Sequence, residues 1–360
     1  MAVEIGTDLN SRTLVRYALK GMALGFVVMG AVLFFTISPE TADEVRAFPL
    51  GFLPLILLLV CGSWLCSGAR LWVLARSLGY KMTLFQGVIT GLAAEFGVAA
   101  TPGGVGGTVI RLVFMKKSGV PITAGASILT ADAVLDVSFF VILIPFALLV
   151  MRNDSSWGTV MNEFRKIPLA VMISALVLLV GIVMALFRKG GHLTRWIEVK
   201  LEHIESARKR RLASRLRYAR WKTRNALVRI IETTRFVFQR RVPALAAAFT
   251  LTAIQWFCRY GILPVILIAF SGSTSFLPLL VMQGLFLVMS FMILLPGGGG
   301  TVEVITTLVL RQFVPVSAVG VVLIIWRFFT YHLYLLVGGA VFFLVWGNIN
   351  RFFPAEIASN

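Results

Sequence analysis

Charged residues are scarce in this chain. Only 14% of its 360 residues are charged, whereas 58% are hydrophobic and the mean hydropathy is +0.88. A soluble fold cannot hide that much apolar surface, and a single membrane span would not account for it. The composition therefore predicts an all-α polytopic membrane protein.

The residue types that carry most enzyme and metal chemistry are also few. Cys61, Cys66 and Cys258 all fall in apolar stretches without metal-ligand spacing, and the chain has only three histidines. No P-loop, dinucleotide-binding motif or nucleophile–base pair occurs. We therefore expect no metal, no cofactor and no disulfide framework, assign no catalytic residue, and favour a transporter over an enzyme.

Long apolar stretches divide the sequence. They run roughly over residues 17–37, 50–75, 83–102, 122–150, 168–187, 243–271, 276–296 and 316–347. Stretches of about 20 apolar residues can cross a bilayer as helices. We treat residues 1–360 as a single transmembrane domain.

Two Pro-Gly-Gly runs interrupt the apolar sequence at equivalent positions. The run that begins at Pro102 and the run that begins at Pro296 lie 194 residues apart, and the same offset relates Pro121 to Pro315. Paired Gly/Pro interruptions in corresponding halves are typical of transporters with inverted repeats. We predict repeats over about 50–150 and about 243–347. The alternative interpretation is a pair of glycine-rich kinks that serve helix packing.

The net charge of +18 is concentrated between Arg188 and Arg241, where seventeen Lys/Arg and four Glu occur. Beside membrane spans such a block marks a cytoplasmic loop, and we expect no nucleic-acid partner. Apolar residues recur in the 188–241 loop at helical spacing, which favours amphipathic helices on an anionic lipid surface. A solvated loop that only sets orientation is the alternative.

The charges conflict with a full crossing by every apolar stretch. If 83–102 crossed the membrane, the basic 188–241 loop would lie on the outer side. Treating 83–117 and 276–311 as re-entrant hairpins removes the conflict and leaves about six full spans. The two repeats then have opposite orientations, and both termini are cytoplasmic.

Glycine-rich hairpin tips and buried charges are the candidate site residues. Helices expected to begin near Thr108 and Val302 would aim unpaired N–H groups at the midplane, which suits an anion. The residues predicted to bind this anion are Gly103, Gly104, Gly106, Gly107, Thr108, Arg111, Gly297, Gly298, Gly299, Gly300, Arg259 and Arg327. The residues predicted to gate the site or balance its charge are Glu95, Asp132, Asp136, Glu303 and Tyr331.

Several of these residues have a structural interpretation as well. Glu303 would equally cap its own helix, and buried Asp and Arg residues would equally hold the two repeats together. Asp132 and Asp136 form too sparse a pair for a magnesium site. We expect Arg70, nearer a span end, to extend its charge toward the membrane surface.

The same motifs resemble the flippase-like transmembrane family, which includes the membrane region of lysylphosphatidylglycerol synthases. The Thr101–Gly107 run, Arg111 and the Asp132-x-x-x-Asp136 pair resemble its first half. The Leu295–Glu303 run and the Arg327–Tyr331 run resemble its second half. The resemblance covers roughly residues 15–350, and Thr108 and Ala133 depart from its usual pattern.

The resemblance implies translocation of an anionic phospholipid or a polyprenyl-phosphate-type lipid across a bacterial inner membrane. The soluble transferase domain of the synthases is not recognisable in the sequence, so we expect a stand-alone member. The alternative is a membrane-embedded lipid-modifying enzyme, or an accessory subunit of a lipid-linked glycan or hopanoid pathway. Association into a homodimer is left open.

Overall fold

The computed structural model describes residues 48–101, 104–151, 241–271 and 313–353, together with positions 43, 46, 233, 234, 238, 274, 276, 279, 280, 283, 284, 306, 307, 310 and 311. The regular elements in these ranges are all helical, as the composition predicts. The chain divides into two compact units, one formed by Met1–Val120 with Ala247–Asn360 and the other by Pro121–Ala246.

Helices long and apolar enough to cross a membrane occur at four places in the described part, which confirms a multi-pass membrane protein. They are Leu50–Ser77, Ile122–Ala147, Val242–Ser271 and Val316–Gly347. Each coincides with a predicted span to within a few residues. The predicted spans at 17–37 and 168–187 and the tip of the hairpin predicted at 276–311 lie outside the described residues.

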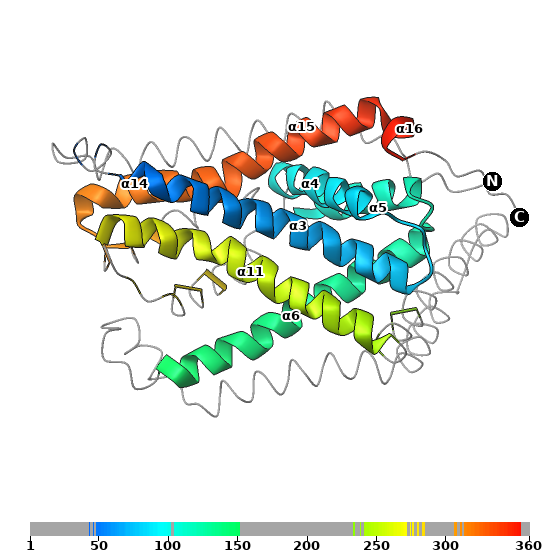
Figure 1. The fold of residues 1–360 in the computed structure, drawn as a ribbon, viewed down its shortest axis with the longest axis horizontal. Helices are drawn as coiled ribbons and strands as arrows, with labels where there is room; N and C mark the ends of the chain where they lie inside the picture. Colours follow the sequence, from blue (N-terminus) through cyan, green and yellow to red (C-terminus); the bar gives the residue numbers. More distant parts are fainter. Residues whose placement is uncertain are drawn as a thin grey trace, which may run out of the picture. The chain divides into compact units, whose positions relative to one another are not determined.

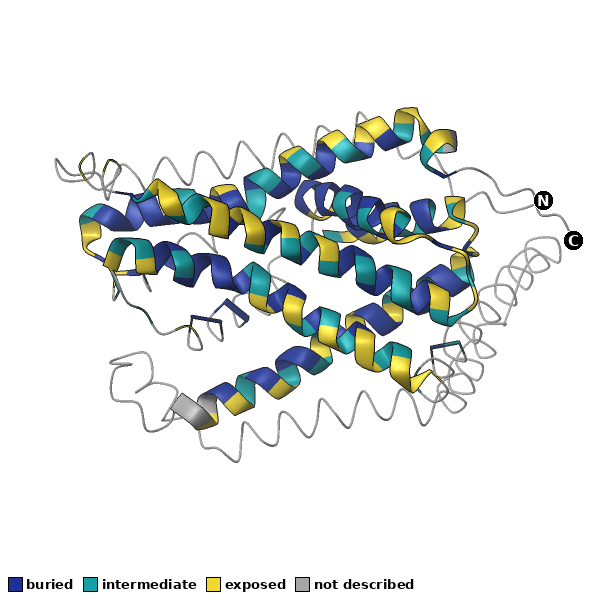
Figure 2. Ribbon diagram, in the orientation of Figure 1, coloured by how far each residue is buried: buried dark blue, intermediate teal, exposed yellow. Residues whose placement is uncertain are grey.

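Helices α3 (Leu53–Ser77) and α11 (Val242–Ser271) pack side by side in the first unit (Figure 1). A short 3-10 turn at Leu50–Phe52 leads into α3. The first turn of α3 contains a proline, whose missing N–H costs no hydrogen bond because the first N–H groups of a helix have no partner within it. Side chains of both helices share one hydrophobic core with α14 (Val316–Arg327). The opposite side of α3 stays exposed (Figure 2).

Helices α4 (Leu84–Ala100) and α5 (Val105–Lys117) form a helical hairpin. A capping box between Thr83 and Gln86 starts α4. At the turn, the Thr101 hydroxyl donates to the Gly97 carbonyl at 2.7 Å and accepts from the Gly106 N–H at 2.8 Å. Gly104 caps α5 with a φ of 70°, which glycine adopts without strain. Because of this turn α5 begins at Val105, three residues before the predicted start.

Glycines let α4 approach its neighbours closely. A Cβ on Gly97 would lie 2.6 Å from the Gly106 carbonyl carbon of α5, and a Cβ on Gly87 would lie 2.5 Å from the Gly68 carbonyl oxygen of α3. A Cβ on Gly338 would lie 2.7 Å from the Leu92 carbonyl oxygen. These are backbone contacts, so α4 is held by three small-residue crossings of the kind that membrane helices use.

A π-helical turn interrupts the last long span. Helix α14 ends at Arg327, the π-helical turn covers Phe328–His332, and α15 (Leu333–Gly347) continues to the short α16 (Ile349–Phe352). Such turns insert an extra residue into a helix and often accompany functional sites. The Tyr331 hydroxyl in this turn donates to the Ala99 carbonyl, 3.5 Å away at the end of α4. The turn therefore lies beside the tip of the α4–α5 hairpin.

Both open ends of that hairpin meet α16 and its neighbours. At the start of α4, Phe85 stacks on Phe352 with ring centroids 6.5 Å apart. Near the end of α5, Phe114 contacts Phe353 with ring centroids 5.4 Å apart. Several basic residues flank this end of the first unit, namely Arg76, Lys81, Lys116, Lys117 and Arg351.

The helix boundaries keep the offset seen in the sequence. Helices α3 and α11 end at Ser77 and Ser271, which are 194 residues apart. Helix α6 (Ile122–Met151) and α14 begin at Ile122 and Val316, again 194 residues apart. One helix end and one helix start therefore fall at equivalent residues of the two predicted repeats.

The second unit contributes one long described helix, α6. Pro145 lies inside it, and the Thr234 hydroxyl donates to the Ser127 carbonyl at 3.4 Å.

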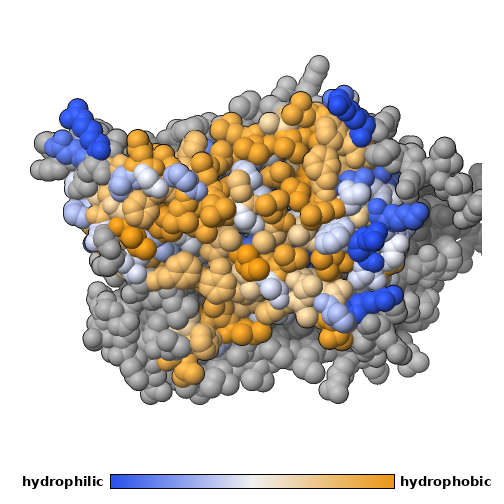
Figure 3. All heavy atoms as spheres, viewed as in Figure 1, coloured by the Kyte–Doolittle hydropathy of each residue, from blue (hydrophilic) through white to orange (hydrophobic). Residues whose placement is uncertain are grey.

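The visible face of the molecule is mostly hydrophobic, with hydrophilic side chains gathered near helix ends (Figure 3). Large exposed side chains such as Leu58, Leu65 and Leu344 suit contact with lipid.

Candidate functional site

An ion pair inside the first unit joins two helices that are far apart in sequence. Nη1 of Arg259, on α11, lies 3.3 Å from Oε1 and 3.5 Å from Oε2 of Glu95, on α4. The Arg259 side chain is 23% exposed and that of Glu95 is 9% exposed. A charge within a span is unfavourable unless it is paired or serves a function. Glu95 supplies that partner for Arg259.

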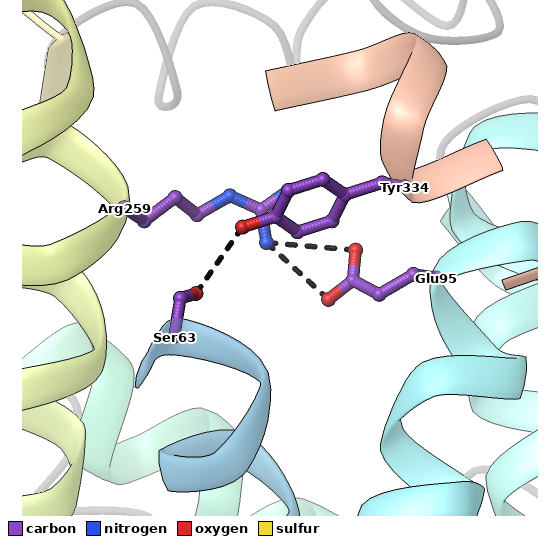
Figure 4. A network of polar contacts seen from close by, with 4 residues as sticks. All are labelled: Ser63, Glu95, Arg259 and Tyr334. Carbon is purple, nitrogen blue, oxygen red and sulfur yellow. Dashed lines mark hydrogen bonds and ion pairs between the residues drawn. The ribbon is translucent and has the colours of Figure 1, made fainter. Parts of the chain in front are cut away.

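Two further helices complete a polar network around this pair (Figure 4). The Arg259 guanidinium carbon lies 4.5 Å from the centre of the Tyr334 ring of α15, a cation–π contact. The Tyr334 hydroxyl donates to Oγ of Ser63, on α3, at 3.3 Å. Tyr334 is 2% exposed and Ser63 is 1% exposed. Side chains from α3, α4, α11 and α15 therefore meet around one cation.

The hydrogen bonds from Arg259 to described residues use only part of its guanidinium. Both contacts with Glu95 leave from Nη1, and no described residue accepts from Nε or Nη2. A guanidinium can hold two acceptors through its planar fork. Since the side chain is also partly exposed, Arg259 can engage a second anion while it is still near Glu95.

A second buried polar contact joins α3 with α11. Nη1 of Arg70, on α3, donates to the Thr252 hydroxyl of α11 at 2.9 Å, and Arg70 is 1% exposed. The expectation that Arg70 extends to the membrane surface is therefore wrong. The reason is that α11 places a hydroxyl opposite it, a tertiary contact that the α3 sequence does not show.

Some buried polar atoms near the network have no partner in the part of the chain that the structure describes. Among the described residues no group hydrogen bonds to Oε1 of Gln255 or to Nε1 of Trp64. Gln255 lies one turn before Arg259 on α11, and the Trp64 ring meets the Tyr334 ring edge-on with centroids 5.1 Å apart. Buried polar atoms without partners lower stability unless a ligand or water satisfies them. Within the described ranges no group of three or more His, Cys, Asp or Glu could hold a metal.

Arg327 and Tyr331, two predicted site residues, lie together at the π-helical turn. The Arg327 guanidinium carbon lies 5.4 Å from the ring centre of Trp326 and 5.6 Å from that of Tyr331. Arg327 is 7% exposed. Two aromatic rings thus contact this further buried cation beside the hairpin tip.

The residues predicted around the first glycine run divide between two faces of α5. Gly106 and Gly107 are buried against α4, so in the structure they serve close packing. Thr108 is exposed and Arg111 is half-buried, one turn apart on the remaining surface. Headgroup binding by these residues, and by Gly104 at the cap of α5, stays a prediction.

Other predicted site residues fall elsewhere. Asp132 is 3% exposed and Asp136 is half-buried, one turn apart on α6 of the second unit. Gly103, the 297–300 glycines and Glu303 lie outside the described residues. The first unit therefore brings together Glu95 with Arg259, and Arg327 with Tyr331.

Sequence reasoning missed Ser63 and Tyr334. Neither is charged, and an isolated hydroxyl in an apolar span is common, so no pattern marked them. A partial signal was present for Ser63, because Ser63, Ser67 and Arg70 recur at helical spacing on α3 and all three are buried.

Tyr334→Phe is expected to lower the free energy of unfolding by about 1 kcal/mol, the net contribution of one neutral hydrogen bond. The ring would still cover Arg259, so the cation–π contact would persist. Thermal unfolding in detergent would measure the change, with Tyr334→Leu as the comparison. A larger loss for Tyr334→Leu than for Tyr334→Phe is expected, and equal losses would contradict a role for the ring.

The fold and the network define a class: a polytopic α-helical membrane protein with a charged cluster buried between its spans. The chain belongs to the family described as the lysylphosphatidylglycerol synthase TM region, whose profile matches residues 22–338. It is similar to a UPF0104 membrane protein of Archaeoglobus fulgidus, with 24% identity over 312 residues, 87% of this chain and 92% of that protein.

Proposed function

We propose that this protein translocates an anionic lipid between the leaflets of its membrane, with the headgroup phosphate held at Arg259. The observation that carries the proposal is the partly exposed guanidinium, which lies inside a span and has two nitrogens that no described residue engages in a hydrogen bond. A phosphate binds well to a guanidinium fork. Membership of a lipid-linked membrane family supports the same substrate class. An anionic phospholipid and a polyprenyl phosphate share the required chemistry.

The α4–α5 hairpin enters and leaves the membrane on one side in this proposal. Its two open ends meet the short helix that follows the last span, and its tip meets Tyr331. Tyr331 lies midway along Val316–Gly347. At 1.5 Å per residue, the 13 residues of α5 reach only about 20 Å, less than a bilayer of about 30 Å. A tip at mid-depth supports a re-entrant hairpin.

The inverted repeat is the second structural element of the proposal. The shared 194-residue offset of helix boundaries supports two homologous halves. A re-entrant first hairpin means that an odd number of full crossings separates the halves, which inverts the second relative to the first. The second hairpin, predicted at 276–311, would then enter from the other side, and its Glu303 would complete the charge balance.

The basic end of the first unit faces the cytoplasm in this proposal, by the positive-inside rule. Arg76, Lys116 and Arg351 mark that end. The C-terminus and the 188–241 loop follow on the same side, in the inner membrane of a bacterium. Thr108 and Arg111, on the lipid-accessible side of α5, would guide the headgroup toward Arg259.

Lipid translocation is tested with the full chain in proteoliposomes that carry fluorescent phosphatidylglycerol, phosphatidylethanolamine or polyprenyl phosphate. Dithionite quenching reports the fraction of label on the outer leaflet. We expect translocation of an anionic lipid, slowed roughly 10- to 100-fold by Arg259→Gln, because a hydrogen bond to a charged group contributes about 1.5–3 kcal/mol. Arg351→Gln, on α16 and exposed, is the matched control that should leave the rate unchanged.

Two outcomes would reject the proposal. Folded wild-type protein that moves none of the three lipids is not a translocator of this class. Translocation that continues at the wild-type rate in Arg259→Gln would mean that the headgroup binds elsewhere. A covalent change in the lipid during incubation would instead identify an enzyme.

A further inference from the structure

The Arg259–Glu95 pair has one member that can change its charge. An arginine stays protonated at any pH a protein tolerates, whereas a glutamate can bind a proton. The pair is neutral when Glu95 is ionised. Any change in the charge of this site during transport must therefore come from Glu95 or from the ligand.

The geometry of the pair suits exchange of one anion for another. Both oxygens of Glu95 approach the same nitrogen, at 3.3 and 3.5 Å. Strong arginine–carboxylate pairs use two nitrogens at about 2.7–2.9 Å. Glu95 thus contacts one nitrogen of the guanidinium and does not form the two-nitrogen pair. A phosphate would take the remaining donors and replace Glu95 as the stronger partner.

Replacement leaves an excess of negative charge. The neutral pair plus one phosphate monoanion carries a net charge of −1 inside a span, where an uncompensated charge is strongly unfavourable. Glu95 is the less exposed partner, so solvent does little to stabilise its carboxylate. A proton on Glu95 restores neutrality and provides an O–H donor for the phosphate.

The other groups facing Glu95 do not supply this charge. Helix α11 presents Arg259, with Cys258 and Tyr260 beside it, and α15 presents Tyr334. Helix α5 packs on α4 through glycines and Ile110, which do not titrate, and its half-buried Arg111 makes no contact with Glu95. Helix α3 presents Ser63 and Cys66. Arg70 lies two turns beyond Ser63 on the same helix and donates to the Thr252 hydroxyl. Arg259 is the one cation of the described residues that contacts Glu95 in this network.

We propose that Glu95 takes up one proton each time an anionic headgroup binds Arg259, so that one proton crosses the membrane with each lipid. This inference rests on the proposed function. It makes the cargo a lipid monoanion together with a proton and makes the transport step electroneutral. A pH gradient across the membrane would then drive translocation toward the alkaline side.

Proton uptake on binding is measurable with the purified full chain. Short-chain phosphatidylglycerol is a suitable probe, because a phosphodiester lacks the second ionisation near pH 6 of a phosphate monoester. Isothermal titration in two buffers of different ionisation enthalpy gives the number of protons bound per lipid. We expect about one in the wild-type protein. The bound state holds the extra proton, so the affinity should fall with rising pH, approaching about tenfold per pH unit.

Variants separate the coupling from the binding site. Glu95→Gln imitates the protonated side chain, so it should bind the probe with no proton uptake and no pH dependence. Arg259→Gln should bind at least tenfold more weakly. If Glu95→Gln does not fold, the wild-type proton count still decides. Wild-type binding without proton uptake would overturn the coupling and leave the translocator proposal standing, whereas absence of wild-type binding at every pH would overturn both.

Discussion

Gly338→Leu is expected to lower the free energy of unfolding by about 3 kcal/mol, the upper part of the usual range for overpacking. A Cβ at this position would lie 2.7 Å from the Leu92 carbonyl oxygen and 2.8 Å from the Phe96 backbone nitrogen. Both atoms belong to the backbone of α4, so no side-chain rotation relieves the clash. The helix would have to move away from α15.

Displacement of α4 would also reach the proposed site. Glu95 lies next to Phe96 on α4, and Tyr334 lies one turn from Gly338 on α15. Gly338→Leu should therefore reduce lipid translocation together with stability. Denaturation with SDS in mixed micelles would measure the stability, and the proteoliposome assay would measure transport.

Gly347→Leu is the matched control, since Gly347 is on the same helix and a Cβ added there would have nothing within 4 Å. We expect its free energy of unfolding to stay within about 0.5 kcal/mol of the wild type. Equal losses for the two variants would show that α15 disfavours any side chain at these glycines, and the close crossing with α4 would be refuted.

Glu95→Leu is expected to destabilise the protein by about 3–5 kcal/mol, because it leaves Arg259 as a buried charge without its partner. The loss is not a measure of the ion pair itself. It includes the unfavourable placement of a lone cation between spans. The same denaturation assay would quantify it.

Removing both charges distinguishes these contributions. In Glu95→Leu with Arg259→Met, no buried charge remains, and most of the stability should return, as in other proteins whose buried ion pairs were replaced by apolar residues. Translocation should remain slowed, roughly 10- to 100-fold, because the double variant lacks the Arg259 guanidinium. A double variant as unstable as the sum of the single ones would show that the two side chains do not interact.

These two experiments address different features. The glycine variants test how α4 is positioned, and the charge variants test whether the pair of Glu95 with Arg259 is needed for stability and transport. Loss of transport in a stable double variant would assign a functional role to the charges beyond holding helices together.

The membrane spans were predictable from the sequence because hydropathy is a local property. The stretches 50–75, 122–150, 243–271 and 316–347 agree with the helices observed there. The turn at Thr101 was predictable too, since its glycine run permits a positive φ. The predicted start of α5 lies three residues too late. The Thr101 hydroxyl, outside the helix, accepts from the Gly106 N–H, and this contact sets where the first turn of α5 forms.

The candidate site was predictable only in part. Glu95 and Arg259 were singled out as buried charges, but 164 residues separate them and nothing in either segment indicates the other. Arg70 was assigned to the surface for the same reason, since Thr252 lies 182 residues away. Ser63 and Tyr334 carry no charge and were not identified at all.

From the amino-acid sequence alone it follows that the chain spans a membrane, which segments are apolar enough to do so, where glycine and proline interrupt them, and which charges lie at depth. These are properties of composition and short-range order. The tertiary structure decided which of those charges meet. Pairing across α3, α4, α11 and α15 depends on helix packing, and small differences in glycine placement set the distance and rotation of each helix.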